Sequence, residues 1–274
     1  MFIAHLSDPH IGLRPGRYEC EIKPTLALRR ALAHVAGLKP APDVVLISGD
    51  LTDTGNAADY QTVAELLQAQ FPSSDQGGPQ VLIVPGNHDA RAAAQQVLGA
   101  YMPVADDAPG DTLCLHVAHG GLHFIGLDTT VPGAPHGVLD APRLQWLQRH
   151  LHAAAGQPVL IFMHHPPLVT GLAAMDACGL LQGAPELGEL VAAHGQVQLI
   201  AAGHMHRHIV GQLGGAPVVV VPSTSHQIAL DLNPDGPLAC RLEPAMVGVY
   251  RWTPEHGLAS HFSYVKSFGT PMPV

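Results

Sequence analysis

Five short clusters of carboxylate, amide and imidazole side chains are the residues of this chain best suited to chemistry. Each cluster directly follows a run of apolar or β-branched residues of the kind that forms a strand. The clusters are Ser7-Asp8-Pro9-His10, Ser48-Gly49-Asp50, Pro85-Gly86-Asn87-His88-Asp89, His164-His165 and Gly203-His204-Met205-His206. In open α/β sheets, sites form outside the carboxyl ends of the strands, so we expect these distant clusters to meet in one crevice.

The donor atoms of these clusters are oxygen and imidazole nitrogen with no thiolate, a set that suits Zn, Fe, Mn or Co. The 274-residue chain has 19 histidines, and imidazole is the commonest metal ligand. Taken singly, each cluster has a plainer explanation: Asp8 could cap a turn, Gly49-Asp50 is a common turn, and an Asx turn could explain Asn87. Their order and their shared place at strand ends favour a metal site.

Alternating strands and helices must position these clusters. The sequence predicts strands at residues 2–6, 44–47, 81–84, 123–127, 159–163, 198–201, 218–221, 247–252 and 261–265. It predicts helices at 25–35, 59–70, 91–98, 141–153 and 185–193. This alternation indicates the α/β class with a buried, partly parallel sheet. We expect residues 169–183 to form a long loop, and the last third to add an antiparallel portion or a small cap.

Charge and hydropathy exclude several partners. With 13 lysines and arginines against 22 aspartates and glutamates, the net charge of −9 argues against binding nucleic-acid polymers or anionic membranes. The sequence shows neither a signal peptide nor an apolar run of transmembrane length, so we expect a cytoplasmic protein without a membrane span. The four cysteines, with no C-x-x-C pair, are expected as free thiols, although three disulfide pairings are conceivable: Cys20, Cys114, Cys178 and Cys240.

The ordered clusters resemble the motifs of the calcineurin-like binuclear metallophosphoesterase superfamily. The resemblance covers residues 8–206 and rests on Asp8-Pro9-His10, Gly49-Asp50, Gly86-Asn87-His88-Asp89, His164 and Gly203-His204-Met205-His206. The segment from Gly49 to Gly55 and Asn87-His88-Asp89 look like the bacterial cyclic-nucleotide and glycerophosphodiester phosphodiesterase branch. Thr54 stands where protein phosphatases of this superfamily have arginine, and Asp89 where they usually have glutamate, which argues against protein phosphatase activity.

This resemblance implies a four-layer α/β/β/α sandwich with mixed sheets. Residues 1–274 would form a single metallophosphoesterase domain, with a small C-terminal cap or dimerisation element within about 207–274. Relatives often form dimers or higher oligomers, so a homo-oligomer is expected.

The resemblance also implies two divalent metal ions per chain, drawn from Fe, Mn, Zn or Co. One set of ligands would be Asp8, His10, Asp50 and His206, and the other would be Asp50, Asn87, His164 and His204. Asp50 would bridge the two ions, because the two oxygens of a carboxylate can serve two cations. The family pattern favours His164 over its neighbour His165 as the ligand, which leaves His165 to support the ligands.

Catalysis and substrate binding would fall to residues beside the ligands. His88 is the expected catalytic residue, either binding a phosphate oxygen or protonating the departing alkoxide. Asp53 and Asp89 are expected either to orient imidazoles or simply to form turns. The expected substrate-binding residues are Tyr18, Asn87, His88 and His226.

We expect a metal-dependent phosphodiesterase that hydrolyses small diesters, either glycerophosphodiesters or 3′,5′-cyclic nucleotides, by attack of a metal-activated water. A phosphomonoesterase or nucleotide pyrophosphatase could use the same binuclear site. A non-catalytic metal-binding scaffold is less favoured, because such a protein would normally have lost ligands and here every ligand position is filled.

Overall fold

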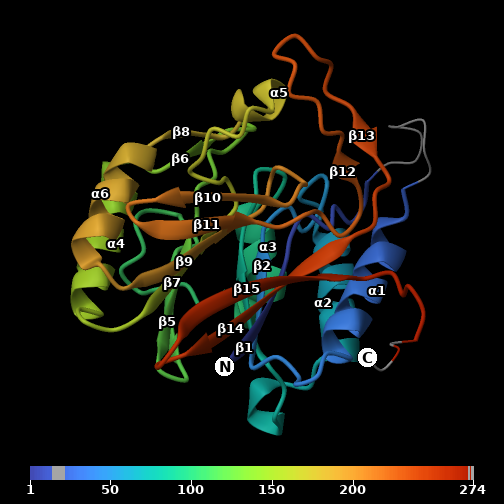
Figure 1. The fold of residues 1–274 in the computed structure, drawn as a ribbon, viewed down its shortest axis with the longest axis horizontal. Helices are drawn as coiled ribbons and strands as arrows, with labels where there is room; N and C mark the ends of the chain where they lie inside the picture. The colour runs from blue at the N-terminus through green and yellow to red at the C-terminus, as the bar shows by residue number, and fades with distance from the viewer. Residues whose placement is uncertain (14–21, 271, 273–274) are drawn as a thin grey trace.

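Two large β-sheets form the centre of the protein. In this computed structural model, which describes residues 1–13, 22–270 and 272, the first sheet has the strand order β15-β14-β1-β2-β3 and the second β10-β11-β9-β7-β5-β4 (Figure 1). The strands of the first sheet are β1 (Phe2–Leu6), β2 (Val44–Ser48), β3 (Gln80–Val84), β14 (Met246–Thr253) and β15 (Gly257–Tyr264). Those of the second are β4 (Leu115–His119), β5 (Leu122–Leu127), β7 (Val159–Met163), β9 (Val197–Ala202), β10 (Ile209–Leu213) and β11 (Ala216–Val220).

Both sheets are mixed, as expected. β1, β2 and β3 run parallel, and β14 and β15 extend that sheet in antiparallel pairs. β5, β7, β9 and β11 run parallel, and the antiparallel strands β4 and β10 close the two edges. The parallel strands place the five polar clusters at the carboxyl ends of β1, β2, β3, β7 and β9.

Alternating side chains on the strands build three apolar layers. In β2, Val45 and Ile47 face one core while Val44 and Leu46 face another, as the two-residue period of a strand requires. The first core packs against α1 (Pro24–Ala36), α2 (Ala57–Gln70) and α3 (Arg91–Leu98). A second core packs β7 and β9 against α4 (Ala141–Ala153) and α6 (Ala184–His194).

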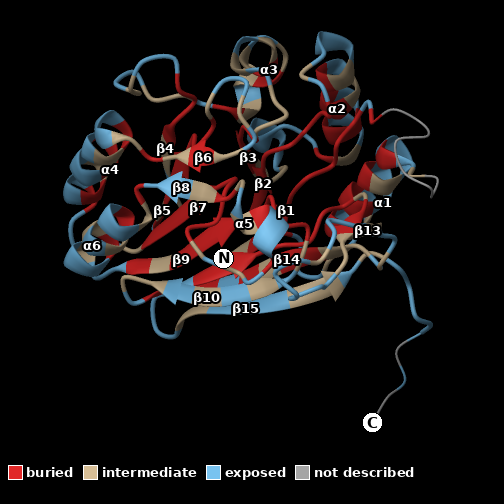
Figure 2. Ribbon diagram, turned by 90° about the horizontal axis from the view of Figure 1, so that it is seen from above, coloured by how far each residue is buried: buried red, intermediate tan, exposed pale blue. Residues whose placement is uncertain are grey.

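The third core lies between the two sheets and includes Ile3, Phe124, Phe162 and Trp252. Figure 2 shows the central strands almost entirely buried, with helices α4 and α6 at one side and α1 and α2 at the other. The four-layer α/β/β/α sandwich is therefore confirmed.

The structure adds elements that the sequence pattern did not predict. Edge strands β4 and β10 are only half buried, so polar residues and glycine interrupt their apolar pattern. The expected long loop at 169–183 was wrong: it holds α5 (Ala173–Asp176) and β8 (Leu180–Gln182), which pairs with β6 (Gly137–Val138). The Asp176 carboxylate organises this segment by accepting hydrogen bonds from the Thr170 hydroxyl at 2.7 Å and the Gly171 amide at 2.8 Å.

The C-terminal quarter completes the sheets rather than standing apart from them. Residues 207–274 supply β10, β11, β14 and β15, and also a two-stranded ribbon of β12 (Gln227–Ile228) and β13 (Cys240–Arg241). Two short 3-10 helices, η1 (Ser74–Gln76) and η2 (Gly99–Tyr101), follow α2 and α3. None of the helices in the described part of the chain is long and apolar enough to cross a membrane. Cys114 and Cys178 carry free thiols, and Cys20 lies outside the described residues.

We expect the stability of the metal-free protein to fall in acid because His5 is buried in β1. Burial lowers the pKa of His5 to about 3, with the charge of Asp8 partly opposing the shift, against 6.5 for an ordinary histidine. The unfolded chain therefore binds the extra proton first, and stability is lost as the pH falls from 6.5 towards 3. The loss approaches about 1.4 kcal/mol per pH unit within that window. Urea unfolding at several pH values should give a shallower dependence for His5→Gln; an unchanged slope would contradict this assignment.

Candidate metal centre

The polar clusters of the two sheets meet across the interface between β1, β2, β7 and β9. The backbone amide of His204, after β9, donates to Asp8 Oδ2, after β1, at 3.0 Å. The imidazole of His164, after β7, donates from Nδ1 to the carbonyl of Ser48, at the end of β2, at 2.7 Å. The structure thus brings together all seven residues that the sequence singled out as metal ligands.

The first group of donors consists of Asp8, His10 and His206, all buried. His206 Nε2 lies 3.2 Å from Asp8 Oδ1 and 3.1 Å from His10 Nε2. Asp8 Oδ1 is buried and has no hydrogen-bond partner among the described residues. Burial alone would raise the pKa of Asp8, but His206 holds it well below its usual range. A buried, ionised oxygen beside two imidazole nitrogens fits a cation.

The second group is centred on His164 Nε2. This nitrogen lies 3.0 Å from Asn87 Oδ1, 3.2 Å from His204 Nδ1 and 3.4 Å from Asp50 Oδ2. The carbonyl oxygen of Asn87, the carboxylate of Asp50 and a ring nitrogen of His204 therefore all lie close to His164 Nε2. This set also fits a divalent cation that accepts nitrogen and oxygen ligands.

Asp50 stands between the two groups through a single oxygen. Its Oδ2 lies 3.6 Å from His10 Nε2 as well as 3.4 Å from His164 Nε2. Its Oδ1 instead accepts the backbone amide of His88 at 2.9 Å. The expected bridging role of Asp50 stays a prediction, and this geometry favours Oδ2 as the bridging oxygen, because Oδ2 faces an imidazole nitrogen of each group. Burial opposes ionisation of Asp50, but His164 and His10 hold its pKa well below the ordinary value.

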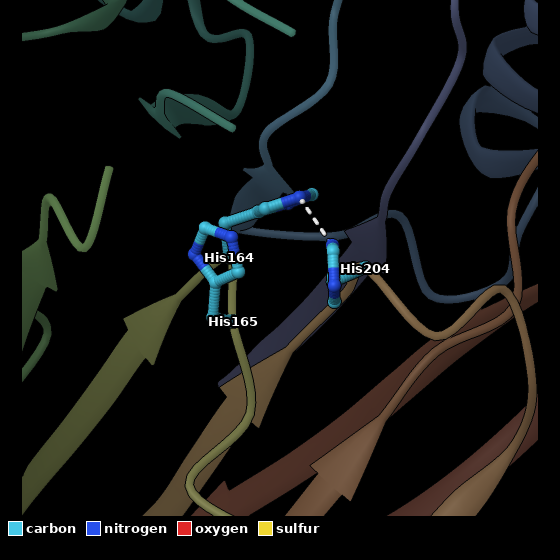
Figure 3. A group of neighbouring side chains, drawn as sticks. All are labelled: His164, His165 and His204. Atoms are coloured by element: carbon cyan, nitrogen blue, oxygen red, sulfur yellow. Dashed lines mark hydrogen bonds between the residues drawn. The ribbon is translucent and has the colours of Figure 1, made fainter. Parts of the chain in front are cut away.

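The two adjacent histidines after β7 point in different directions. Figure 3 shows the His164 ring reaching towards His204, whereas the His165 ring is turned to the other side of the chain. Both ring nitrogens of His165 are engaged: Nδ1 is 2.8 Å from the Thr129 hydroxyl, and Nε2 is 3.1 Å from the Pro135 carbonyl. One ring nitrogen of His165 nevertheless lies within 4.8 Å of a ring nitrogen of His164 and of His204. Because both nitrogens of His165 are already hydrogen-bonded, the geometry favours His164 as the metal ligand, since His164 Nε2 faces the other donors.

Several polar groups hold the imidazoles in place. Asp53 Oδ1 lies 3.4 Å from His10 Nδ1, and the Asp53 carbonyl accepts from His88 Nδ1 at 2.8 Å. The His226 carbonyl accepts from His206 Nδ1 at 2.9 Å. The Nδ1 atoms of His88 and His206 are hydrogen-bonded, and that of His10 faces Asp53, so the opposite Nε2 of each ring is presented to the site.

Asp89 does not orient an imidazole and instead organises the loops. Its carboxylate accepts hydrogen bonds from the Gly86 amide at 2.9 Å, the Leu51 amide at 3.1 Å and the Tyr60 hydroxyl at 3.0 Å. Burial, with the nearby charge of Asp50, raises the pKa of Asp89 to about 6. Of the two roles considered for Asp89, the structure supports that of a turn former.

The backbone of the site is strained at the donor residues themselves. Among the described residues, the five non-glycine positions with positive φ are Asp8, His10, Asp50, His204 and His206, with values from 48° to 68°. Such conformations cost free energy and cluster at functional sites. Gly49, at φ +88°, allows the loop after β2 to approach the loop after β3, because a Cβ on residue 49 would lie only 2.6 Å from the Gly86 amide nitrogen. The sequence pattern gave no warning of this strain beyond the glycines beside the donors.

The other predicted site residues lie at different depths. The His88 side chain is 29% exposed, and its ring lies 4.9 Å from the His10 ring, centroid to centroid. His226 is buried, with its ring 4.6 Å from that of His206. Tyr18 lies outside the described residues. Cys178, which the sequence did not indicate, places its sulfur 3.6 Å from His204 Nε2.

Fold and site together define an α/β protein with two adjoining groups of His and Asp side chains that could hold metal ions, and Asp50 lies between them. The Calcineurin-like phosphoesterase family matches residues 1–208, and the chain belongs to that family. The chain is 32% identical to the "Probable glycerophosphodiester phosphodiesterase GpdQ" of Arcobacter nitrofigilis, over 100% of this chain and 96% of the relative. It is 30% identical to the cAMP/cGMP dual specificity phosphodiesterase of Mycobacterium tuberculosis, over 93% and 78% respectively.

Solved structures extend the likeness to the fold. A dimetal phosphatase from Danio rerio superposes with a TM-score of 0.65 at 14% identity, covering 97% of this chain and 99% of that one. Together, the family and the relatives' names support a hydrolase that acts on phosphodiesters.

Proposed function

We propose that the protein is a metal-dependent phosphodiesterase that hydrolyses small phosphodiesters. The position of Asp50 carries this proposal, because its Oδ2 lies 3.6 Å from His10 Nε2 and 3.4 Å from His164 Nε2. One anionic oxygen is thereby shared by two groups of donors. Such sharing suits a pair of divalent cations, as used in in-line displacement at phosphorus.

The two ligand sets are those that the sequence motifs suggested. Asp8, His10, Asp50 and His206 would hold one cation, and Asp50, Asn87, His164 and His204 would hold the other. When bound, the cations would lower the pKa of a coordinated water and neutralise charge on the phosphoryl oxygens. Oxygen and imidazole donors accept Fe, Mn, Zn and Co, so we propose two divalent ions of this class.

His88 is the proposed general acid. Its Nδ1 is held by the Asp53 carbonyl at 2.8 Å, so its Nε2 is the atom available to a substrate. A proton on Nε2 would pass to the departing alkoxide oxygen. Asn87 and His226 would contact substrate, supported by the closeness of the His226 ring to those of His10, at 5.3 Å, and His206. Tyr18 remains a proposed contact on sequence grounds.

The substrate class comes from the relatives. Their names specify glycerophosphodiesters in one case and cyclic nucleotides in another, and both are small diesters. The net charge of −9 favours small substrates over nucleic-acid polymers. A phosphomonoesterase or nucleotide pyrophosphatase using the same site is the second candidate.

A turnover panel with the manganese-loaded protein tests the proposal. It would compare glycerophosphocholine, 3′,5′-cyclic AMP, bis(p-nitrophenyl) phosphate and p-nitrophenyl phosphate at equal concentration. We expect the diesters to be hydrolysed faster than the monoester. A preference for p-nitrophenyl phosphate would contradict the diesterase and favour the monoesterase.

We expect Asn87→Ala to weaken one cation site selectively. The change removes the Oδ1 that lies 3.0 Å from His164 Nε2 but leaves Asp8, His10 and His206 untouched. Loss of one neutral oxygen ligand should reduce occupancy of the second site and lower kcat, with the thermal unfolding of the metal-free protein little changed. Metal analysis after gel filtration checks the occupancy. Two retained cations with normal turnover would show that Asn87 is no ligand.

We also propose a single domain that forms homo-oligomers in the cytoplasm, with residues of 207–274 providing the contact. The support is a group of exposed leucines around the β12–β13 ribbon: Leu230, Leu232, Leu238 and Leu242. Exposed apolar groups of this kind mark association surfaces. Light scattering should show a dimer or larger species, and Leu232→Glu with Leu238→Glu should yield monomer. A monomeric wild-type protein would contradict the proposal.

A further inference from the structure

A chain of buried polar side chains crosses the first sheet beneath the metal centre. Tyr250 on β14, His5 on β1, Ser48 at the end of β2 and Ser7 after β1 are all fully buried. The Tyr250 hydroxyl lies 2.8 Å from His5 Nδ1, and His5 Nε2 lies 2.8 Å from Ser48 Oγ. Polar groups are costly in a core unless they are hydrogen-bonded, so this arrangement calls for an explanation.

The hydroxyl protons settle the direction of the chain. Ser48 Oγ donates to Ser7 Oγ at 2.8 Å, and Ser7 Oγ donates to the Ser48 carbonyl at 3.1 Å. The single proton of the Ser48 hydroxyl is therefore used, and Ser48 Oγ can only accept from His5 Nε2. In a neutral imidazole that carries its proton on Nε2, Nδ1 is an acceptor. Tyr250 must then donate to His5 Nδ1, and every bond runs from β14 towards Ser48.

The chain ends on the carbonyl that holds a metal ligand. The Ser48 carbonyl accepts from Ser7 Oγ and also from His164 Nδ1, at 2.7 Å. With its proton kept on Nδ1, His164 turns the Nε2 lone pair towards Asp50, Asn87 and His204. The same peptide leads into Gly49 and Asp50, whose φ angles are +88° and +48°. The direction of the Ser48 carbonyl thus affects both a ligand and the turn that carries the shared carboxylate.

We propose that Tyr250 and His5 are positioning residues that act through Ser48 to fix the orientation of His164. The proposal rests on the proposed function only in taking His164 as a metal ligand. Tyr250 lies beyond residues 1–208, the span that the family matches, so no motif points to it. Partners that orient a ligating histidine typically contribute 10–100-fold to metal affinity. Because Tyr250 acts through intervening bonds, we expect a smaller effect, about 3–10-fold.

The first experiment needs no variant. A long-range ¹H–¹⁵N NMR spectrum of the metal-stripped protein reports which ring nitrogen of each histidine carries the proton. We expect His5 to carry its proton on Nε2, and we expect the Nδ1 of His164 to be protonated. A His5 ring protonated on Nδ1 would reverse the chain and overturn the proposal.

The second experiment measures cation affinity. Tyr250→Phe removes only the hydroxyl, and a Co²⁺ titration followed by its visible absorption should show binding weakened by about 3–10-fold. Tyr101→Phe is the matched control. The Tyr101 hydroxyl interacts with Gln68 and does not belong to the hydrogen-bonded network of Tyr250 and His5. In a Ser48→Ala background, Tyr250→Phe should cause no further loss, because the path between them is already broken.

Three results separate this inference from the proposed function. A wild-type protein that binds two Co²⁺ ions, together with a Tyr250→Phe variant of equal affinity, would refute the role of Tyr250 alone. Equal losses from Tyr250→Phe in the wild-type and Ser48→Ala backgrounds would refute transmission through Ser48. A wild-type protein that binds no Co²⁺ would refute the metal centre itself, and with it this inference.

Discussion

Asp50→Asn is expected to reduce phosphodiester hydrolysis by about 10³-fold. The amide oxygen can still accept the His88 amide, which lies 2.9 Å from Oδ1, so the loop remains bonded. The amide nitrogen then replaces Oδ2 and presents protons to His10 and His164 instead of a shared anion. A metal pair stabilises such a transition state by several kcal/mol. A 10³-fold loss of rate corresponds to about 4 kcal/mol of that stabilisation.

The loss should appear in metal content as well as in turnover. Inductively coupled plasma analysis of the manganese-loaded variant should find fewer than two ions per chain. Asp106→Asn makes the same chemical change at an exposed carboxylate and should behave as wild type. Two bound ions and undiminished turnover in Asp50→Asn would mean that no cation uses this oxygen.

His88→Ala is expected to lower kcat by 10²–10⁴-fold for a substrate with an alcohol leaving group, the usual effect of losing a general acid. The backbone amide of residue 88 survives the change and still donates to Asp50, so both cations should stay bound. The defect should be far smaller for bis(p-nitrophenyl) phosphate, because p-nitrophenolate departs without a proton.

Comparing the two leaving groups distinguishes acid catalysis from a structural effect. Rates for glycerophosphocholine and for bis(p-nitrophenyl) phosphate are measured on the same preparation, with metal content determined in parallel. His152→Ala, an exposed histidine on α4, serves as the control. Equal losses on both substrates, or loss of a cation, would show that His88 is not the proton donor.

The central strands were predictable from the sequence, and the edges of the sheets were not. Strands such as β2 and β7 are buried on both faces, so their sequences are continuous apolar runs. β10 alternates between half-buried and exposed positions at an edge, and its glycine and glutamine give no clear pattern. The short elements α5 and β8 depend on hydrogen bonds to Asp176 and on pairing with β6, which local sequence does not reveal.

At the site, the motifs predicted which residues meet but not how each atom is used. That Asp50 offers one oxygen to both groups follows from the hydrogen bond with the His88 amide, a contact between two loops. The orientations of His164 and His165 depend on Ser48, Thr129 and Pro135, which lie far away in the sequence. The left-handed backbone at the donors is likewise set by packing between loops, because none of these residues is glycine.

The requirement for two cations is tested most directly by titrating Mn²⁺ into metal-stripped protein while following bis(p-nitrophenyl) phosphate hydrolysis. The shared position of Asp50 predicts negligible turnover without Mn²⁺ and a rise that saturates at two equivalents per chain. Full turnover in the presence of chelator, or saturation at one equivalent, would contradict a binuclear hydrolase.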